Sequence, residues 1–276
     1  LLRNAALGCE GIIHTAGKAG LWGAAADYER INVEGTRTVI QVCRDLHISL
    51  LVHTSSPSIV QGNGDIEGGN ESLPLAKHFL APYPASKARA EELVLAANSV
   101  SLKTTALRPH LIWGPGDPHI LPHLIASVRG GRLRLPGMTK RVDTVYVENA
   151  ALAHVNALLE LSGEGKCAGK AYFISNDEPL PQGEIIQRLL AAVGIQAEIR
   201  EVPAWLARLA GAVCETTWRM LRLKSEPPVT RFSADQLSTA HWYDIGAAKR
   251  DLAYRPRLSI AEGLIELGRS AHARTA

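Results

Sequence analysis

The sequence predicts an α/β protein built on a doubly wound parallel sheet, and three observations support this prediction. The run GIIHTAG (11–17) is short, apolar and ends in glycine, which is typical of a strand buried on both faces. Strand and helix signals then alternate through the first half of the chain. The next strand candidate, SLLVHTSS (49–56), stops at small polar residues. This alternating order places consecutive strands parallel, with helices on the faces of the sheet.

The elements of the first half follow from apolar spacing and end signals. Apolar residues recur at helical spacing between 28 and 46. Pro84 favours the first turn of a later helix, because a missing N–H costs nothing there. In chain order we expect a strand at 11–17, a helix at 28–46, a strand at 49–56, a glycine-rich loop at 62–72, a helix at 84–98 and a strand at 103–116.

The second half mixes strands and helices, without an internal repeat or a low-complexity linker. We expect helices at 119–131, 181–194 and 203–223, a strand leading into a helix at 142–161, a strand at 170–176 and two short helices within 243–270. These elements predict a smaller mixed α/β lobe that packs onto the sheet.

Composition excludes several classes of protein. The 276 residues carry a net charge of only +3, and no basic stripe interleaved with aromatic residues indicates a nucleic-acid partner. Four cysteines lie without a C-x-x-C pair, which favours reduced thiols in a cytoplasmic protein over disulfides or a zinc site. His119 and His123 are four apart but lack a third metal ligand, so no metal site is expected. Charges interrupt every long apolar run, so no membrane span is expected.

The predicted strand ends bring three kinds of functional group together. In an open parallel sheet, ligands bind at the carboxyl ends of the strands. The strand at 49–56 delivers Ser56 to that edge, and the helix that follows carries Tyr83 and Lys87 on one face. A nearby ammonium is expected to lower the pKa of a phenol. A hydroxyl, a phenol and an ammonium suit proton transfer coupled to hydride transfer at a carbonyl or an alcohol.

These residues and their flanks resemble the extended short-chain dehydrogenase/reductase family, within its 3β-hydroxysteroid and sterol dehydrogenase branch. The resembling strings run in family order over nearly the whole chain. They are HTAG (14–17), NVEGT (32–36), HTSSPS (53–58), YPASK (83–87), LRPHLIWGPGD (107–117) and AAKRDLAYRP (247–256). Strings outside the catalytic motif are similar to bacterial reductases of 2-alkyl-3-oxoalkanoates, which act in a long-chain olefin pathway. These are KAGLWG (18–23), GKAYFISNDEPLP (169–181) and AVCETTW (212–218).

The resemblance implies a role for each site residue. Tyr83 would be the general acid/base, Lys87 would lower its pKa and bind the nicotinamide ribose, and Ser56 would orient the substrate. Asn32 would support the site. The cofactor, NADP(H) in preference to NAD(H), would be contacted by Ala16, Gly17, Thr54, Tyr83, Lys87, Pro109 and Ile112.

The resemblance also implies a domain organisation and a function. We expect a Rossmann-like dinucleotide-binding domain at 1–117, to which 142–176 returns, and a substrate-binding lobe at 118–141 and 177–276. The expected reaction is reduction of the keto group of a 2-alkyl-3-oxoalkanoate, a β-keto acid. Oxidation of a 3β-hydroxysteroid or sterol is the alternative, and nucleotide-sugar epimerisation a weaker third. The helices at 28–46 and 84–98 would form a homodimer.

The chain departs from the family pattern at its beginning. The glycine-rich turn that cradles a pyrophosphate, and the residue that selects NAD or NADP, are not in the sequence. Two βα units, roughly 60 residues, would hold them. The first residues, LLRNAALGCE, are typical of a helix end with Gly8 as its C-cap signal. We therefore expect an N-terminally incomplete Rossmann domain. A non-catalytic remnant that acts as a binding or sensing protein is the alternative of another class.

The helix at 203–223 has two interpretations. Arg208, Glu215, Arg219 and Arg222 share one face, while apolar residues such as Trp205 occupy the others. One interpretation is ordinary packing within the second lobe. The other is an amphipathic lid over a long acyl chain, or a helix that lies on a membrane surface and gives the protein a peripheral association.

Overall fold

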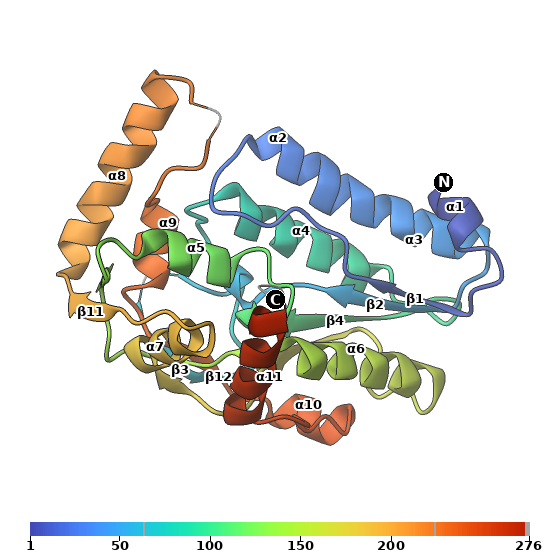
Figure 1. Ribbon diagram of the computed structural model, residues 1–276. Helices are drawn as coiled ribbons and strands as arrows, with labels where there is room; N and C mark the ends of the chain where they lie inside the picture. Colours follow the sequence, from blue (N-terminus) through green and yellow to red (C-terminus); the bar gives the residue numbers. More distant parts are fainter. Residues whose placement is uncertain (63, 224, 274–276) are drawn as a thin grey trace.

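The computed structural model describes residues 1–62, 64–223 and 225–273, and a four-stranded parallel sheet lies at its centre (Figure 1). Its strands, in spatial order, are β1 (Gly11–His14), β2 (Leu50–Thr54), β4 (Lys103–Pro109) and β9 (Lys170–Ile174). All of its pairings are parallel, and His14 lies opposite His53 in the register. The predicted α/β fold with a parallel sheet is confirmed, and the carboxyl ends of β1 and β2 meet at one edge.

Helices cover both faces of this sheet (Figure 1). One face carries α2 (Ala25–Tyr28), a π-helical turn (Glu29–Glu34), α3 (Gly35–Asp45) and α4 (Pro82–Ala96), and the other carries α6 (Val147–Ser162). Leu51 of β2 is fully buried in a cluster with Val39 and Cys43 of α3 and Val94 of α4. Burial of these apolar faces holds the helices on the sheet. The short helix α1 (Leu2–Ala5) contributes Ala6, at its end, to the same cluster.

The remaining strands lie outside the central sheet. They make a mixed sheet in the order β10–β7–β12–β3 and two parallel pairs, β11–β6 and β5–β8. These strands are β3 (Ile66–Gly69), β5 (Ile112–Trp113), β6 (Arg132–Leu135), β7 (Arg141–Val142), β8 (Val145–Tyr146), β10 (Leu180–Pro181), β11 (Glu198–Glu201) and β12 (His241–Tyr243). The helices are α5 (Ile120–Ser127), α7 (Gln182–Ala192), α8 (Ala204–Met220), α9 (Arg231–Gln236), α10 (Gly246–Asp251) and α11 (Ile260–Ala273).

The segment predicted as a glycine-rich loop at 62–72 contains the strand β3, so that prediction is wrong for Ile66–Gly69; Asn63 lies outside the described residues. β3 pairs in parallel with β12, with Ile66 opposite His241. The strand is short and glycine-rich, and its partner comes from near the other end of the chain. Local apolar spacing therefore gave no signal for it.

Helix α8 faces the body of the protein with its charged side. Gly211 lies so close to α9 that a Cβ there would be 2.7 Å from the carbonyl carbon of Thr230. Glu215 is buried beside this contact and accepts a hydrogen bond from the Arg231 backbone N–H at 2.7 Å. The outward side chains are large and apolar, and they are Trp205, Leu206, Leu209, Val213 and Met220. The polarity of this helix is therefore the reverse of an ordinary surface helix.

No helix in the described part of the chain is long and apolar enough to cross a bilayer.

Candidate active site

The carboxyl end of β2 fixes Ser56 at the edge of the sheet. Thr54 is the last residue of β2, and Ser56 caps the short 3₁₀ helix Pro57–Ile59. The Ser56 Oγ accepts a hydrogen bond from the Ser58 backbone N–H at 3.3 Å and lies 2.9 Å from the Ser58 Oγ. A side chain held by its capping bond has little rotamer freedom left. Ser56 is buried beneath the edge where a ligand would sit.

Tyr83 meets Ser56 from the first turn of α4. The Tyr83 side chain is half-buried and shares a hydrogen bond with the Ser56 hydroxyl. Burial raises the pKa of Tyr83 above its usual value, and the hydrogen bond to Ser56 opposes this effect. Two of the predicted catalytic residues thus come together, although 27 positions separate them in the sequence.

Lys87 lies one turn further along α4 and is buried. Its ammonium donates a hydrogen bond to the backbone carbonyl oxygen of Thr54. Burial lowers the pKa of Lys87 to about 8, and the Glu91 carboxylate opposes this effect. Lys87 therefore joins α4 to the last residue of β2, two positions before Ser56.

The direction of the Tyr83 pKa differs from the sequence-based expectation. We expected Lys87 to lower it, but the burial of Tyr83 dominates and raises it. The ammonium of Lys87 is engaged by the Thr54 carbonyl oxygen. A phenol with a raised pKa keeps its proton at neutral pH and is a weaker acid than a free tyrosine side chain.

Asn32 ties the loop after β1 to the helix α4. Its Oδ1 accepts from the Lys18 backbone N–H at 2.6 Å, and its Nδ2 donates to the Ser86 Oγ at 2.8 Å. The Ser86 hydroxyl in turn donates to the Tyr83 carbonyl oxygen at 2.8 Å. Asn32 lies in the π-helical turn Glu29–Glu34, and such turns frequently mark functional sites. Sequence reasoning named Asn32 but gave no signal for the role of Ser86.

Three buried histidines lie behind Lys87. We call His14, His53 and His154 the sheet histidines. The His154 Nδ1 faces the Ala150 carbonyl oxygen at 2.7 Å, so its Nε2 accepts from the Thr54 hydroxyl at 2.7 Å. Burial lowers the pKa of each of the three, and the charge of Lys87 lowers it further. These histidines are therefore uncharged at neutral pH.

The residues expected to hold a cofactor lie along the same edge. Ala16 and Gly17 are exposed just beyond β1. A Cβ at Gly17 would lie 3.7 Å from the Lys87 Nζ and 3.3 Å from the Asn32 Oδ1. Pro109 ends β4, and Ile112 begins β5 with an exposed apolar side chain. A bare backbone, an ammonium and an exposed aliphatic side chain fit the ribose and nicotinamide end of a dinucleotide.

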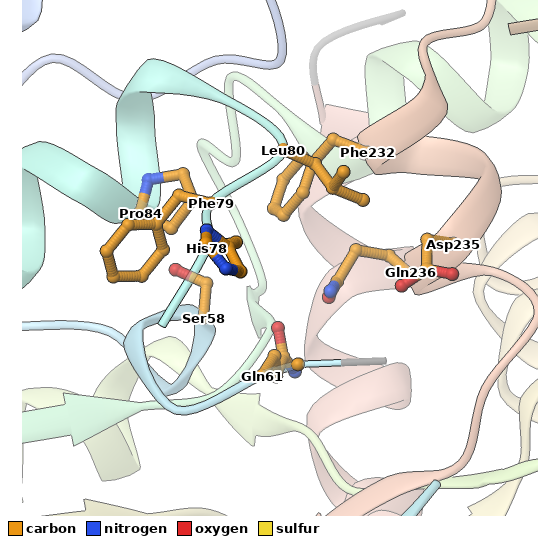
Figure 2. Close-up of a pocket in the computed structure, with 10 residues that line it drawn as sticks. Ser58, Gln61, His78, Phe79, Leu80, Pro84, Phe232, Asp235 and Gln236 are labelled. Atoms are coloured by element: carbon orange, nitrogen blue, oxygen red, sulfur yellow. The ribbon is translucent and has the colours of Figure 1, made fainter. Parts of the chain in front are cut away.

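A small pocket of about 20 Å³ adjoins the Ser56–Tyr83 contact (Figure 2). Ser58 and Pro84 line it, and these residues are close neighbours of Ser56 and Tyr83 in the chain. Across the pocket lie Phe232, Asp235 and Gln236 of α9, as Figure 2 shows. The pocket therefore lies between the sheet edge and the second lobe. Sequence reasoning missed the α9 residues, because the helix is only one to two turns long.

The described residues contain no group of three or more His, Cys, Asp or Glu side chains that could hold a metal ion. Within that part of the chain, His123 lies 3.6 Å from a Glu226 carboxylate oxygen.

Comparison with known proteins agrees with this geometry. The sequence pattern of the 3-beta hydroxysteroid dehydrogenase/isomerase family matches residues 1–203. A protein of Stenotrophomonas maltophilia named 2-alkyl-3-oxoalkanoate reductase is 49% identical over 98% of this chain and 83% of its own length. The protein of that name from Shewanella oneidensis is 48% identical over 96% of this chain and 71% of its length. A mouse sterol-4-alpha-carboxylate 3-dehydrogenase is 32% identical, with 89% and 69% covered.

Solved structures share the fold. A UDP-glucuronic acid 4-epimerase from Bacillus cereus, in complex with NAD, superposes with a TM-score of 0.71 at 18% identity, covering 100% of this chain and 78% of its own. The RMD protein from Pseudomonas aeruginosa, complexed with NADPH, gives a TM-score of 0.69 at 18% identity, with 96% and 82% covered. At these identities the likeness concerns the fold alone.

Proposed function

This chain belongs to the 3-beta hydroxysteroid dehydrogenase/isomerase family and is an oxidoreductase, and on that premise we propose that it reduces the keto group of a 2-alkyl-3-oxoalkanoate. The two relatives of that name, each close to half identical over nearly the whole chain, support this substrate class. Oxidation of a 3β-hydroxysteroid or sterol is the second candidate, because the sterol dehydrogenases are also relatives.

The observation on which the proposal depends is the contact between Ser56 and Tyr83. In the proposed reaction the Ser56 hydroxyl holds the substrate carbonyl oxygen. The Tyr83 hydroxyl donates its proton to that oxygen as negative charge develops on it. The buried ammonium of Lys87, held by Thr54, places a positive charge beside the site where it favours the developing anion.

We propose a nicotinamide cofactor, with NADP(H) favoured and NAD(H) as the alternative. When bound, it supplies the hydride. On this chain Ala16, Gly17, Thr54, Pro109 and Ile112 would hold it, together with Lys87 and Tyr83. Support comes from the exposed backbone beside Lys87 and from structural neighbours that hold NAD or NADPH.

Substrate turnover tests this proposal. Protein expressed from its complete coding sequence should oxidise NADPH in the presence of a 2-alkyl-3-oxoalkanoate, and faster than NADH. Turnover of a 3β-hydroxysteroid alone would instead favour the second candidate. A titration with NADPH, monitored by fluorescence, tests the alternative of a non-catalytic protein. Absence of both NADPH binding and turnover would favour that alternative.

We further propose that the chain divides as the sequence predicts and forms a homodimer. The Rossmann-like part would be 1–117 with 142–176, and the substrate lobe 118–141 with 177–276. The place of β9 in the main sheet supports this division. The helices α3 and α4 lie side by side on one face of the sheet, where a partner copy could pack against them (Figure 1). Size-exclusion chromatography coupled to light scattering measures the mass of the protein in solution. The mass of a single chain would refute the homodimer.

The outward face of α8 is proposed to rest on an anionic lipid surface. That face offers Trp205 at one end, Leu209 and Val213 in the middle and Met220 at the other end, and the exposed Arg222 follows the helix. Apolar side chains bordered by Trp and Arg are typical of helices that lie in a membrane interface. The inward contacts of Gly211 and Glu215 prevent the helix from turning this face to the core.

Vesicle sedimentation tests this surface. Vesicles containing phosphatidylglycerol should retain the protein, and vesicles of phosphatidylcholine alone should retain less. The double substitution Leu209→Glu with Val213→Glu should abolish binding. The matched control places Glu at Val100 and Ile265, two exposed apolar positions outside α8. Concentration-dependent dimerisation without vesicle binding would mean that a second copy covers this face, and equal loss in both double variants would also refute the proposal.

A further inference from the structure

A buried chain of polar groups crosses from the main sheet into the second lobe. It consists of His110, Asp143 and His241, which are between 1% and 4% exposed. The His110 Nδ1 lies 2.5 Å from the Asp143 Oδ1, and the His110 Nε2 lies 3.1 Å from the His241 Nδ1. The His241 Nε2 lies 2.8 Å from the carbonyl oxygen of Gln236. We call these three residues the interlobe chain.

Hydrogen-bond chemistry assigns a direction to this chain. The His241 Nε2 faces a carbonyl oxygen, which can only accept, so this nitrogen carries a proton. Burial lowers the pKa of His241 to about 4, so the ring is neutral and its Nδ1 is an acceptor. The His110 Nε2 must then donate to it. The other carboxylate oxygen of Asp143 accepts from the Tyr243 backbone N–H at 3.0 Å. Every ring nitrogen in the chain has a partner of matching type when both nitrogens of His110 carry protons, one facing the Asp143 carboxylate and one facing His241.

The two ends of the interlobe chain lie at the two walls of the candidate site. His110 directly follows Pro109, which belongs to the proposed cofactor edge. At the other end, the Gln236 carbonyl belongs to α9, and Gln236, Asp235 and Phe232 line the pocket beside Ser58 and Pro84. The chain also holds β12, because Asp143 binds the Tyr243 backbone. A displacement at either end would therefore change the width of the pocket.

We propose that His110, Asp143 and His241 are positioning residues that set the distance between the α9 wall of the pocket and the Ser56–Tyr83 pair. They thereby determine which substituent of a substrate fits that pocket. This inference rests on the proposed function. Buried polar groups that are fully paired fix one geometry, since any other arrangement leaves a donor or an acceptor unpaired. An apolar contact at the same place would tolerate sliding, because such contacts are not directional.

Three substitutions of His241 separate its bond to His110 from its bond to the Gln236 carbonyl oxygen. His241→Leu removes both hydrogen bonds. His241→Asn keeps an acceptor near the Nδ1 position, and therefore the bond from His110. His241→Gln keeps a donor near the Nε2 position, and therefore the bond to the Gln236 carbonyl. The Asn and Gln variants are a matched pair, since each retains one polar arm. If the Leu variant does not fold, this pair decides the outcome by the same criteria.

The KM for a 2-alkyl-3-oxoalkanoate is the first readout. The Asn and Leu variants, which lose the bond to α9, should raise this KM about tenfold. The Gln variant keeps the bond to α9, and Asp143 still joins His110 to the Tyr243 backbone of β12, so its KM should stay within about twofold of the wild type. The NADPH dissociation constant should not change in any folded variant. A chain that serves only stability would lower the melting temperature of all three without raising KM, and that result would overturn the proposal.

Hydrogen–deuterium exchange provides a readout that does not depend on turnover. Amides at 231–236 should exchange faster in the Asn variant than in the Gln variant, because only the Gln variant retains the contact with α9. Equal exchange in the two variants would refute the positioning role. An inactive wild type with the expected exchange difference would refute the proposed reaction while leaving the positioning role supported.

Discussion

The protein buries two groups of histidines with different surroundings. Burial lowers the pKa of the sheet histidines, His14, His53 and His154, and the charge of Lys87 lowers it further. Neither ring nitrogen of His53 has a hydrogen-bond partner among the described residues. The interlobe histidines, His110 and His241, instead form one chain that ends on the Asp143 carboxylate. The sheet group thus gives Lys87 an uncharged environment, whereas the interlobe group fixes the spacing between two lobes.

The largest expected effect comes from removing the cation at the centre of the sheet group. Lys87→Met should reduce kcat/KM about 10²–10⁴-fold, because the charge that favours proton transfer is lost. The same substitution should raise the pKa of His14 from about 4, since a nearby positive charge lowers it in the native protein. Steady-state kinetics and an NMR titration measure the two effects. Lys77→Met, at an exposed position, is the control. An unchanged His14 titration would contradict this description of the sheet group.

The pH dependence of stability should include one contribution from each group. Burial, together with Lys87 for His14 and His110 for His241, lowers the pKa of both histidines from 6.5 to about 4. The unfolded chain therefore binds their protons first as the pH falls. Each histidine should contribute about 3 kcal/mol that is fully present above pH 6.5 and is lost between pH 6.5 and about 4.

Urea unfolding across this pH range measures the effect. His14→Gln and His241→Gln should each flatten the acid limb of the stability curve, while His119→Gln at an exposed position should leave it unchanged. If the free energy of unfolding falls equally steeply with falling pH in all three variants, groups other than His14 and His241 cause the acid instability.

A smaller effect separates an unpaired histidine from a paired one. His53→Leu should change the free energy of unfolding by less than about 1 kcal/mol, because no hydrogen bond to a described residue is lost. His241→Leu should cost about 2 kcal/mol, since it leaves the His110 donor and the Gln236 carbonyl oxygen unpaired. Chemical denaturation at neutral pH compares them directly. Equal costs would mean that the two groups do not differ in the way proposed.

The fold could be predicted from the sequence wherever the signal was local. The alternation of strands and helices, the small polar residues after β2 and the proline in the first turn of α4 all lie within short stretches of chain. The pairing of β3 with β12 could not be predicted, because it joins a glycine-rich stretch to a distant three-residue strand. Tertiary context decides such pairings, and local propensity does not.

The proximity of Ser56, Tyr83 and Lys87 was predictable from the sequence, but their electrostatics were not. The spacing of Tyr83 and Lys87 gives their shared helix face, and the end of β2 brings Ser56 to the same edge. The pKa of Tyr83 depends on how deeply the phenol is buried, and the position of the Lys87 ammonium depends on the Thr54 carbonyl oxygen. Neither burial nor a backbone partner can be derived from the spacing of residues along the chain.

The measurement that tests the central claim most directly is turnover by Tyr83→Phe, which removes one hydroxyl and keeps the ring. Wild type and variant should bind NADPH with dissociation constants within about twofold of each other. The rate of reduction of a 2-alkyl-3-oxoalkanoate in a single turnover should fall about 10²–10⁴-fold, because the proton donor beside Ser56 is gone. Reduction at the wild-type rate by the folded, cofactor-binding variant would contradict the assignment of Tyr83 as the proton donor.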